Sequence, residues 1–350
     1  MKLTKVDQLE EGNVLEQDIM TREYQVLLGS GTVLKKEYIE KLKELGINEV
    51  FIHDELKIPV KEILILRNDM EKGFHDKIRD VIEKHTYQHN DELQELCQTA
   101  DAIIMEILKE NSVLEKVYDI KERSADLYEH SISLCTLVTL LALKYSLRND
   151  TVHDMGIACL LHDLGLRYLT LNYKDTNMTE MSEIEFNEYK KHPVYAYTSL
   201  KNEKWLSNES KNMILMHHEH IDGSGYPLHA TSIPLTIQII TICDMFDEMI
   251  SGIGYKRKKV HEAVEFLRTA ANQLFPQQLV DNFLNFIAIY PVGTKVKLST
   301  GEEAIVVKQN HTFPDRPIIR IIRDKNGKTV TKEIVRDLVK EASIFVEDAN

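Results

Sequence analysis

The feature that most constrains this chain is a set of histidines and aspartates on the apolar faces of expected helices. In the segment Thr151–Gly165, for example, the apolar face continues to His162 and Asp163. Residues three or four apart share one face of a helix, so an imidazole and a carboxylate are expected to enter the core together. An unpaired polar group there would cost roughly 2 to 7 kcal/mol. The fold must therefore provide partners for these groups.

Other segments of the same region repeat this pattern. Asp126 and His130 lie four residues apart, one turn above the other on an expected helix. The adjacent His217 and His218 follow the apolar face of a second expected helix, and Asp244 follows that of a third. His192 opens a further helix, directly before Pro193. The inward-facing groups are Asp126, His130, His162, Asp163, His192, His217, His218 and Asp244.

These eight groups predict a shared metal centre. Any one of them alone would more simply be a hydrogen-bonded core residue, but eight independent groups would each need a separate partner. Imidazole nitrogens and carboxylate oxygens suit iron, manganese or zinc, and the absence of a thiolate cluster disfavours a structural zinc site. Eight ligands exceed the needs of one ion. We expect two or three divalent ions, with iron or manganese preferred.

The rest of the chain indicates a multidomain, mainly α protein around an all-helical core. At 350 residues it exceeds one compact domain. Highly charged helices precede the core and are expected to form a connector that can also pair two copies into a homodimer. Strands and turn signals follow it. The expected division is a small α+β module at 1–57, the connector at 58–119, the helical domain at 120–290 and a small β-barrel-like module at 291–350.

Composition restricts the partners. The net charge of -13 argues against a nucleic-acid polymer, which needs a positive protein face. The four cysteines have no CxxC spacing and are read as reduced thiols of a cytoplasmic protein. The most apolar stretch, Ile132–Leu147, is shorter than a bilayer span and contains Lys144, so no membrane partner is expected.

Two motifs resemble those of a known family. Leu161–Gly165 reads LHDLG and resembles the HD signature of the HD phosphohydrolase superfamily. His217–Glu219, followed by Asp222–Pro227 with the sequence DGSGYP, resembles the extended HD-GYP signature, and His192 lies between the two motifs. The resemblance covers about Ser124 to Tyr290. It implies an HD-type core and a bacterial signalling enzyme, a phosphodiesterase that hydrolyses cyclic di-GMP to pGpG or GMP.

The resemblance also implies roles for individual residues. His162 and Asp163 would be catalytic, with Asp163 bridging two ions, and a metal-bridging hydroxide would attack phosphorus. Asp126 falls where relatives with a third ion carry an acidic residue, usually Glu. Glu219 would orient an imidazole behind the metal ligands. The implied substrate contacts are Tyr226, Asp247, Lys256, Gly223 and Gly225.

Two departures from the family pattern leave alternatives open. Leu166 stands where the family usually has Lys, although Arg167 is next to it, and Ile253 stands where the family has another cation. Losing two phosphate contacts of roughly 1.5 to 3 kcal/mol each would weaken substrate binding. One alternative is therefore a signalling adaptor with little turnover. It would bind a cyclic dinucleotide, or it would bind a GGDEF protein through the loop Asp222–Pro227, called the GYP loop below. The other is a phosphodiesterase for a different cyclic dinucleotide, such as cyclic GMP-AMP.

Overall fold

The computed structural model describes residues 2–15, 19–20, 26–45, 47, 49–52, 63–88, 92–109, 113–120, 125–310, 313–330 and 332–349. Its internal contacts divide the chain into two compact units, Met1–Pro59 and Val60–Asn350.

The first unit packs one amphipathic helix against short antiparallel strands. Ile39 and Leu42 are three residues apart on the helix and are both buried, together with Leu34 and Val50. This spacing gives the helix a single apolar face, which explains why it covers the strands. The elements are β1 (Lys2–Lys5) paired with β4 (Glu49–Ile52), β2 (Ile19–Met20) paired with β3 (Val26–Leu28), the turn η1 (Val6–Gln8) and the helix α1 (Lys36–Glu44).

The second unit begins with a helical domain. Its α-helices are α2 (Asn68–Gln88), α3 (Glu95–Leu108), α4 (Leu127–Lys144), α5 (Asn149–Leu161), α6 (Glu183–Tyr189), α7 (His192–Leu200), α8 (Asn208–Met216), α9 (Leu235–Ser251), α10 (Val260–Ala270) and α11 (Gln277–Leu284). Its 3-10 turns are η2 (Glu92–Gln94), η3 (Val113–Glu115), η4 (His162–Tyr168) and η5 (Met178–Glu180).

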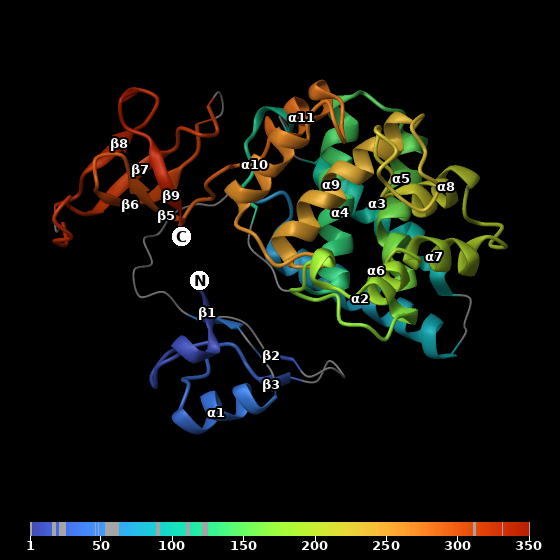
Figure 1. The fold of residues 1–350 in the computed structure, drawn as a ribbon, viewed down its shortest axis with the longest axis horizontal. Coiled ribbons are helices and arrows are strands. Elements are labelled where there is room, and N and C mark those ends of the chain that lie inside the picture. The colour runs from blue at the N-terminus through green and yellow to red at the C-terminus, as the bar shows by residue number, and fades with distance from the viewer. Residues whose placement is uncertain are drawn as a thin grey trace. The chain divides into compact units, whose positions relative to one another are not determined.

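Helices α4 and α9 form the centre of this domain. They are more than 90 residues apart in the sequence, yet they lie side by side (Figure 1), and α5 packs against α4. Nearly every residue of α4 from Leu127 to Ala142 is buried, as is α9 from Ile239 to Ser251. Helices that are apolar on all sides have to be surrounded by other helices, so the polar groups that they carry face the interior of the domain.

The C-terminal part is a five-stranded sheet in which every neighbouring pair of strands is antiparallel. The strand order is β8-β7-β6-β5-β9. Turns at Gly301 and Gly327 have φ of +81° and +77°, a conformation that favours glycine. The strands are β5 (Lys295–Leu298), β6 (Glu303–Lys308), β7 (Ile318–Arg323), β8 (Val335–Asp337) and β9 (Val346–Ala349).

Asp119 connects three segments of the second unit. Its carboxylate accepts hydrogen bonds from the backbone N–H groups of Ile63 (2.9 Å) and Val292 (2.8 Å) and from the side chain of Gln309 (2.9 Å). Asp119 is only 3% exposed. The start of the connector, the end of the helical domain and the β module therefore share one buried acceptor.

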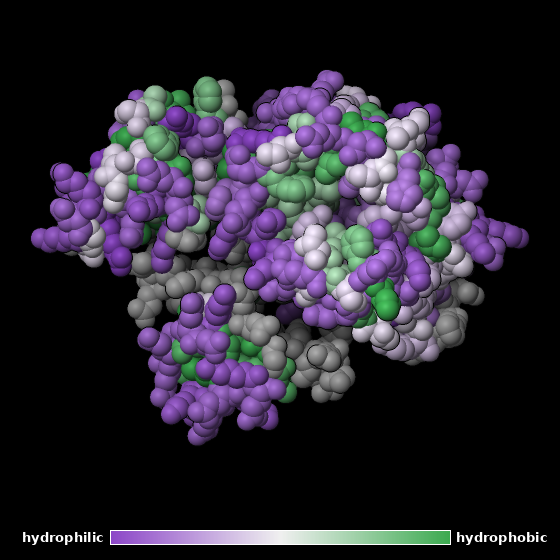
Figure 2. Space-filling view, viewed as in Figure 1, coloured by the Kyte–Doolittle hydropathy of each residue, from purple (hydrophilic) through white to green (hydrophobic). Residues whose placement is uncertain are grey.

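The expected architecture is confirmed: a mainly helical core with a small N-terminal α+β module and a C-terminal β module. The domain boundaries stay predictions. Within the described residues, no helix has both the length and the apolar character needed to cross a membrane. The molecular face drawn in Figure 2 is largely hydrophilic, with hydrophobic side chains in small separate patches.

Candidate metal centre

The ends of several helices converge on one buried cluster. His162 and Asp163 follow α5 directly, His192 opens α7, and His217 and His218 follow α8. Helix α4 adds His130 and α9 adds Asp244 from their interiors. Each of these seven residues is at most 6% exposed. The structure thus brings together seven of the eight residues that the sequence predicted to face one another.

The ring nitrogens in this cluster approach one another closely. The Nε2 atom of His192 lies 3.2 Å from Nε2 of His217 and 3.1 Å from Nε2 of His218. On the opposite side, Nε2 of His130 lies 3.1 Å from Nε2 of His162. Asp163 Oδ1 lies 3.3 Å from His192 Nε2. Imidazole nitrogens and carboxylate oxygens therefore point at a shared space.

Backbone hydrogen bonds fix which nitrogen of each ring carries a proton. The Nδ1 atoms of His162, His192 and His217 each bond to the carbonyl three residues earlier, at 2.7–2.8 Å. A carbonyl only accepts hydrogen bonds, so Nδ1 must be the protonated nitrogen. In a neutral ring Nε2 then presents a lone pair. Backbone carbonyls hold metal-binding histidines in this orientation.

The pKa shifts agree with neutral rings on the α7–α8 side of the cluster. Burial lowers the pKa of His192, lowers that of His217 to about 3, and lowers that of His218 well below its usual range. The Nε2 lone pairs of His192 and His217 consequently face each other at 3.2 Å with no proton between them. Such a contact is repulsive unless a cation lies between the two nitrogens.

Three carboxylate oxygens of the cluster face ring nitrogens. Within the described part of the chain, Asp163 Oδ2 and both carboxylate oxygens of Asp244 are buried without a well-aligned hydrogen bond. Asp244 Oδ1 nevertheless lies 3.1 Å from Nε2 of His130, and Asp163 Oδ2 lies 3.3 Å from Nε2 of His162. Burial alone would raise the pKa of these two carboxyls, but the neighbouring His162 and His130 hold both pKa values below the usual range. Buried anions and facing lone pairs are the donor set of a divalent ion. The residues present fit a metal centre.

His130 is oriented from behind by Asp247. Asp247 Oδ2 accepts a hydrogen bond from His130 Nδ1 at 2.8 Å, and Ser133 donates to the other oxygen. Asp247 is fully buried. We expected Asp247 to contact substrate, but the structure places it behind a cluster histidine, where it fixes the ring and leaves Nε2 facing the cluster.

Sequence reasoning missed Glu248. Its carboxylate forms a group with His218 and Asp244 in which the ligand atoms all lie within 4.8 Å of one another. It is 2% exposed, and burial raises its pKa well above the usual range, with further contributions from Asp244 and Asp163. The available signal was the spacing: Glu248 follows Asp244 by four residues on one helix face.

Asp126 has a different role from the one expected. It is the N-cap residue of α4, where Oδ1 accepts from the backbone N–H groups of Tyr128 (2.9 Å) and Glu129 (3.0 Å). His75 Nε2 lies 3.2 Å from the same oxygen. None of the potential metal-binding groups found among the described residues includes Asp126. Its carboxylate is engaged in holding the start of α4.

Glu219 also differs from expectation. Its two carboxylate oxygens accept hydrogen bonds from the backbone N–H groups of Leu228 and Ala230. Instead of orienting an imidazole, Glu219 holds the end of the GYP loop.

The two loop glycines have structural roles in the same loop. A Cβ at Gly225 would lie 2.4 Å from the carbonyl oxygen of His218, so only glycine fits there. Gly223 has a φ of +77°. Tyr226 continues this loop, and its ring stacks on His218 with 4.7 Å between the ring centroids.

Within the described residues, the remaining expected substrate contact and the two positions where the family would have cations form no side-chain hydrogen bond or ion pair with the cluster residues. Lys256 is exposed. Leu166 and Ile253 are buried in one apolar group with Tyr189. Arg167, which we considered as a substitute for the missing Lys, forms an ion pair with Glu83 at 2.7 Å.

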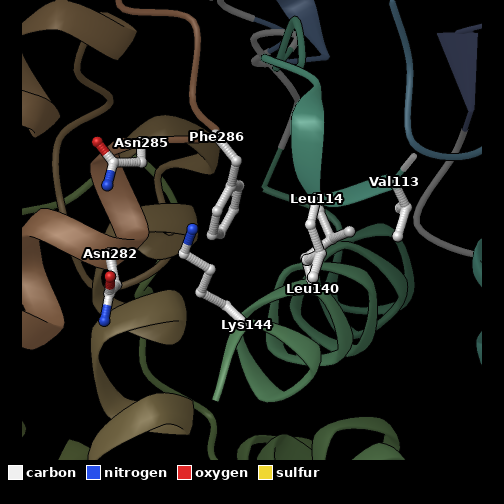
Figure 3. Close-up of a pocket in the computed structure, with 7 residues that line it drawn as sticks. All are labelled: Val113, Leu114, Leu140, Lys144, Asn282, Asn285 and Phe286. Carbon is white, nitrogen blue, oxygen red and sulfur yellow. The ribbon is translucent and has the colours of Figure 1, made fainter. Parts of the chain in front are cut away.

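A separate small pocket lies between α4, α11 and the turn η3 (Figure 3). Its volume is about 20 Å³, which holds about one water molecule and no nucleotide. Its lining residues are Val113, Leu114, Leu140, Lys144, Asn282, Asn285 and Phe286.

Comparisons with known proteins agree with the geometry of the cluster. Residues 113–279 match the HD domain, and residues 295–350 match the KOW domain associated with HD domain. Cyclic di-GMP phosphodiesterase PA4108 of Pseudomonas aeruginosa is 29% identical over 245 residues, covering 68% of this chain and 58% of the relative. The response regulator RpfG of Xanthomonas campestris, also a cyclic di-GMP phosphodiesterase, is 31% identical over 41% of this chain and 39% of the relative.

A third relative has a different substrate in its name. The 3'3'-cGAMP-specific phosphodiesterase 2 of Vibrio cholerae is 28% identical over 53% of this chain and 38% of the relative. The chain spans between 38 and 58% of the lengths of these three relatives. The solved structure of Bd1817, an HDG"Y"P protein from Bdellovibrio bacteriovorus, shares the fold, with a TM-score of 0.53, 17% identity and coverage of 81% of this chain and 97% of that one. Residues 113–279 of this chain thus match the HD domain, and the curated relatives that it resembles are named cyclic di-GMP or 3'3'-cGAMP phosphodiesterases.

Proposed function

We propose that this chain is a metal-dependent phosphodiesterase that hydrolyses a cyclic dinucleotide, with cyclic di-GMP as the first candidate. The observation that carries the proposal is the facing pair of His192 and His217 nitrogens, 3.2 Å apart, beside Asp163 Oδ2 and Asp244 Oδ2, which have no hydrogen bond within the described residues. The relatives PA4108 and RpfG are named cyclic di-GMP phosphodiesterases, which supports the same substrate class here.

The residues of the cluster would hold two or three ions, iron or manganese. When bound, such ions neutralise charge on phosphoryl oxygens and lower the pKa of water, so that water attacks phosphorus at neutral pH. Asp163 has one oxygen facing His192 and a second facing His162, at 3.3 Å in each case. This position between two histidine groups supports Asp163 as a shared ligand. Cleavage of one phosphodiester would give pGpG, and a second cleavage would give GMP.

Tyr226 and Lys190 support a binding role beside the cluster. The Tyr226 hydroxyl is buried and, within the described residues, has no hydrogen-bond partner. The ammonium of Lys190 lies 6.0 Å from the centre of the Tyr226 ring and 4.4 Å from that of Phe186. A cation over aromatic faces is partly desolvated and remains available to an anion. We propose that Tyr226 and Lys190 contact the phosphate that the metal ions do not hold.

The test is product formation under defined metal loading. The protein would be purified without oxygen, loaded with iron(II) or manganese(II), and incubated with cyclic di-GMP, with products followed by chromatography. A variant carrying both His162→Ala and Asp163→Ala is the control. Product from the wild type and none from the control is the expected result; a fully metal-loaded wild type that cleaves no cyclic dinucleotide would refute the proposal.

A second candidate substrate is cyclic GMP-AMP, because one relative is specific for it. A panel of cyclic dinucleotides under identical metal loading would separate the two by kcat/KM. Binding of a cyclic dinucleotide without any product would support the adaptor alternative, which the apolar Leu166 and Ile253 favour. Contact with a GGDEF protein through the GYP loop, homodimerisation through the connector and a cytoplasmic location stay predictions.

A further inference from the structure

Helix α9 carries a buried carboxylate that the expected ligand set does not include. Asp244 and Glu248 are four residues apart and so lie on the same face of the helix, one turn apart. Glu248 Oε1 lies 3.9 Å from Nε2 of His218, and Asp244 Oδ2 lies 3.7 Å from Nδ1 of the same ring. One imidazole thus lies between two carboxylates, each at most 2% exposed.

We propose that Glu248 is a metal ligand and that, together with His218 and Asp244, it forms a metal-binding position at the C-terminal end of α9. This inference deepens the metal centre on which the proposed function rests. It moves the additional ion from Asp126, at the start of α4, to the end of α9.

The surroundings favour a cation over a purely hydrogen-bonded arrangement. Tyr189 donates a hydrogen bond to Glu248 Oε1 at 3.2 Å, which leaves that oxygen a second lone pair. Asp244 Oδ2 is buried without a hydrogen bond in the described residues, while Asp244 Oδ1 lies 3.1 Å from Nε2 of His130. Two carboxylates on successive turns repel each other, and burial strengthens the repulsion. A divalent ion between them would remove this repulsion and provide the missing partner.

Tyr189 is built to hold Glu248 in place. Its side chain is fully buried, and its hydroxyl points at the carboxylate. A Cβ at Gly254 would lie 2.5 Å from the Tyr189 hydroxyl oxygen, so a glycine there gives the hydroxyl its room. Tyr189 therefore acts as a positioning residue, like the partners that orient metal-binding carboxylates in other sites.

Asp126 does not offer an equivalent position. Its Oδ1 accepts from two backbone N–H groups of α4 and faces His75 Nε2 at 3.2 Å. Recruiting this carboxylate to an ion would break the N-cap of α4, at a cost of about 1 kcal/mol. Substitution of Glu248 is therefore expected to weaken metal binding, whereas substitution of Asp126 is not.

The experiment compares Glu248→Gln with Asp126→Asn, two variants that each neutralise one acid at nearly constant volume. Metal-free wild type and variants would be titrated with manganese(II). Free ion would be measured by electron paramagnetic resonance, and bound ion by mass spectrometry after desalting. The expected result is that Glu248→Gln loses one equivalent of bound manganese, or binds it at least tenfold more weakly, while Asp126→Asn keeps the wild-type stoichiometry and affinity.

Wild-type stoichiometry and affinity in a folded Glu248→Gln, or loss of an equivalent in Asp126→Asn, would overturn the inference. Circular dichroism checks folding. If Glu248→Gln does not fold, anomalous diffraction from wild-type crystals soaked in manganese decides: a peak beside the Glu248 carboxylate supports the inference, and its absence there overturns it. Because this readout is metal binding, a protein that holds the ion at Glu248 but cleaves nothing would refute the proposed function and leave the ligand assignment standing.

Discussion

Replacing Gly165 by alanine should disrupt the metal centre without removing any ligand. Gly165 lies in η4, two residues after Asp163, and packs against the start of α7. A Cβ at this position would lie 1.9 Å from the carbonyl oxygen of His192 and 3.0 Å from the backbone nitrogen of Ala196. Ordinary contact begins near 3.4 Å, so α7 or η4 must move by 3.4 − 1.9 = 1.5 Å to admit one methyl group.

This displacement sets the expected losses of stability and of metal affinity. Overpacking of a close-packed interior costs about 1–3 kcal/mol, which corresponds to a fall in melting temperature of roughly 2–12 °C in a domain of this size. The shift is also large for a metal site, since ligand distances have to hold within about 0.2 Å. His192 Nε2 now lies 3.2 Å from that of His217. We expect manganese affinity to fall by roughly 5- to 150-fold, the equivalent of the same 1–3 kcal/mol.

A matched glycine provides the control. Gly73 is exposed in the middle of α2, and a Cβ there would meet nothing within 4 Å. Gly73→Ala should therefore stabilise the protein by about 0.5–1 kcal/mol through helix propensity alone. Both variants would be followed by thermal unfolding with and without metal and by manganese titration. A Gly165→Ala protein with the melting temperature and manganese affinity of the wild type would refute the packing argument.

Four further outcomes are expected. Asp126→Ala should lower stability by about 1 kcal/mol through loss of the α4 N-cap, measured by urea unfolding, while Asp126→Asn keeps most of it. Asp119→Ala should cost about 1–3 kcal/mol for each backbone N–H group left without an acceptor, by the same assay. Lys190→Met should raise KM for the cyclic dinucleotide by roughly 10- to 100-fold with a smaller effect on kcat. Burial alone would lower the pKa of His130, but neighbouring carboxylates raise it to about 9, so the metal-free ring is protonated at neutral pH. Metal binding should release that proton, and metal affinity should therefore increase from pH 6 to 9. Calorimetry in buffers of different ionisation enthalpy measures both effects.

The sequence predicted the burial of the cluster residues because helical periodicity fixes which residues share a face. His162, Asp163 and His130 are buried among apolar neighbours in α4, α5 and η4, and only an inward orientation is compatible with that pattern. Residue spacing alone does not predict that separate helices bring these groups together. That prediction came from the requirement that buried polar groups find partners, and the imidazole rings do lie close to one another.

The differences arise where a residue had two physically reasonable uses. Asp126 precedes the apolar run of α4, so an N-cap and a metal ligand were both compatible with its position, and the cap is the one formed. Glu219 was assigned by its place after two histidines, yet its carboxylate satisfies the backbone of the loop that follows. Periodicity places a side chain on a face, but it does not say which of several nearby donors that side chain will meet.

The two positions where we expected cations lie in one apolar cluster. Leu166 and Ile253 are far apart in the sequence, but both are buried in a single apolar cluster that includes Tyr189. A lysine at either position would bury an ammonium in this cluster, so the wall is apolar as a unit. Positive charge has to come from elsewhere: Arg167 is committed to Glu83.

The sources that the proposed function offers are the bound ions and Lys190. Lys190 lies over the ring of Tyr226, which stacks on His218, so its charge is close to the metal cluster but on a different element from the lost cations. A substrate with two phosphates would then be held by ions at one phosphate and by Lys190 at the other. Under the proposed function, the apolar cluster of Leu166 and Ile253 is compatible with turnover, because Lys190, between α6 and α7, would contact the second phosphate.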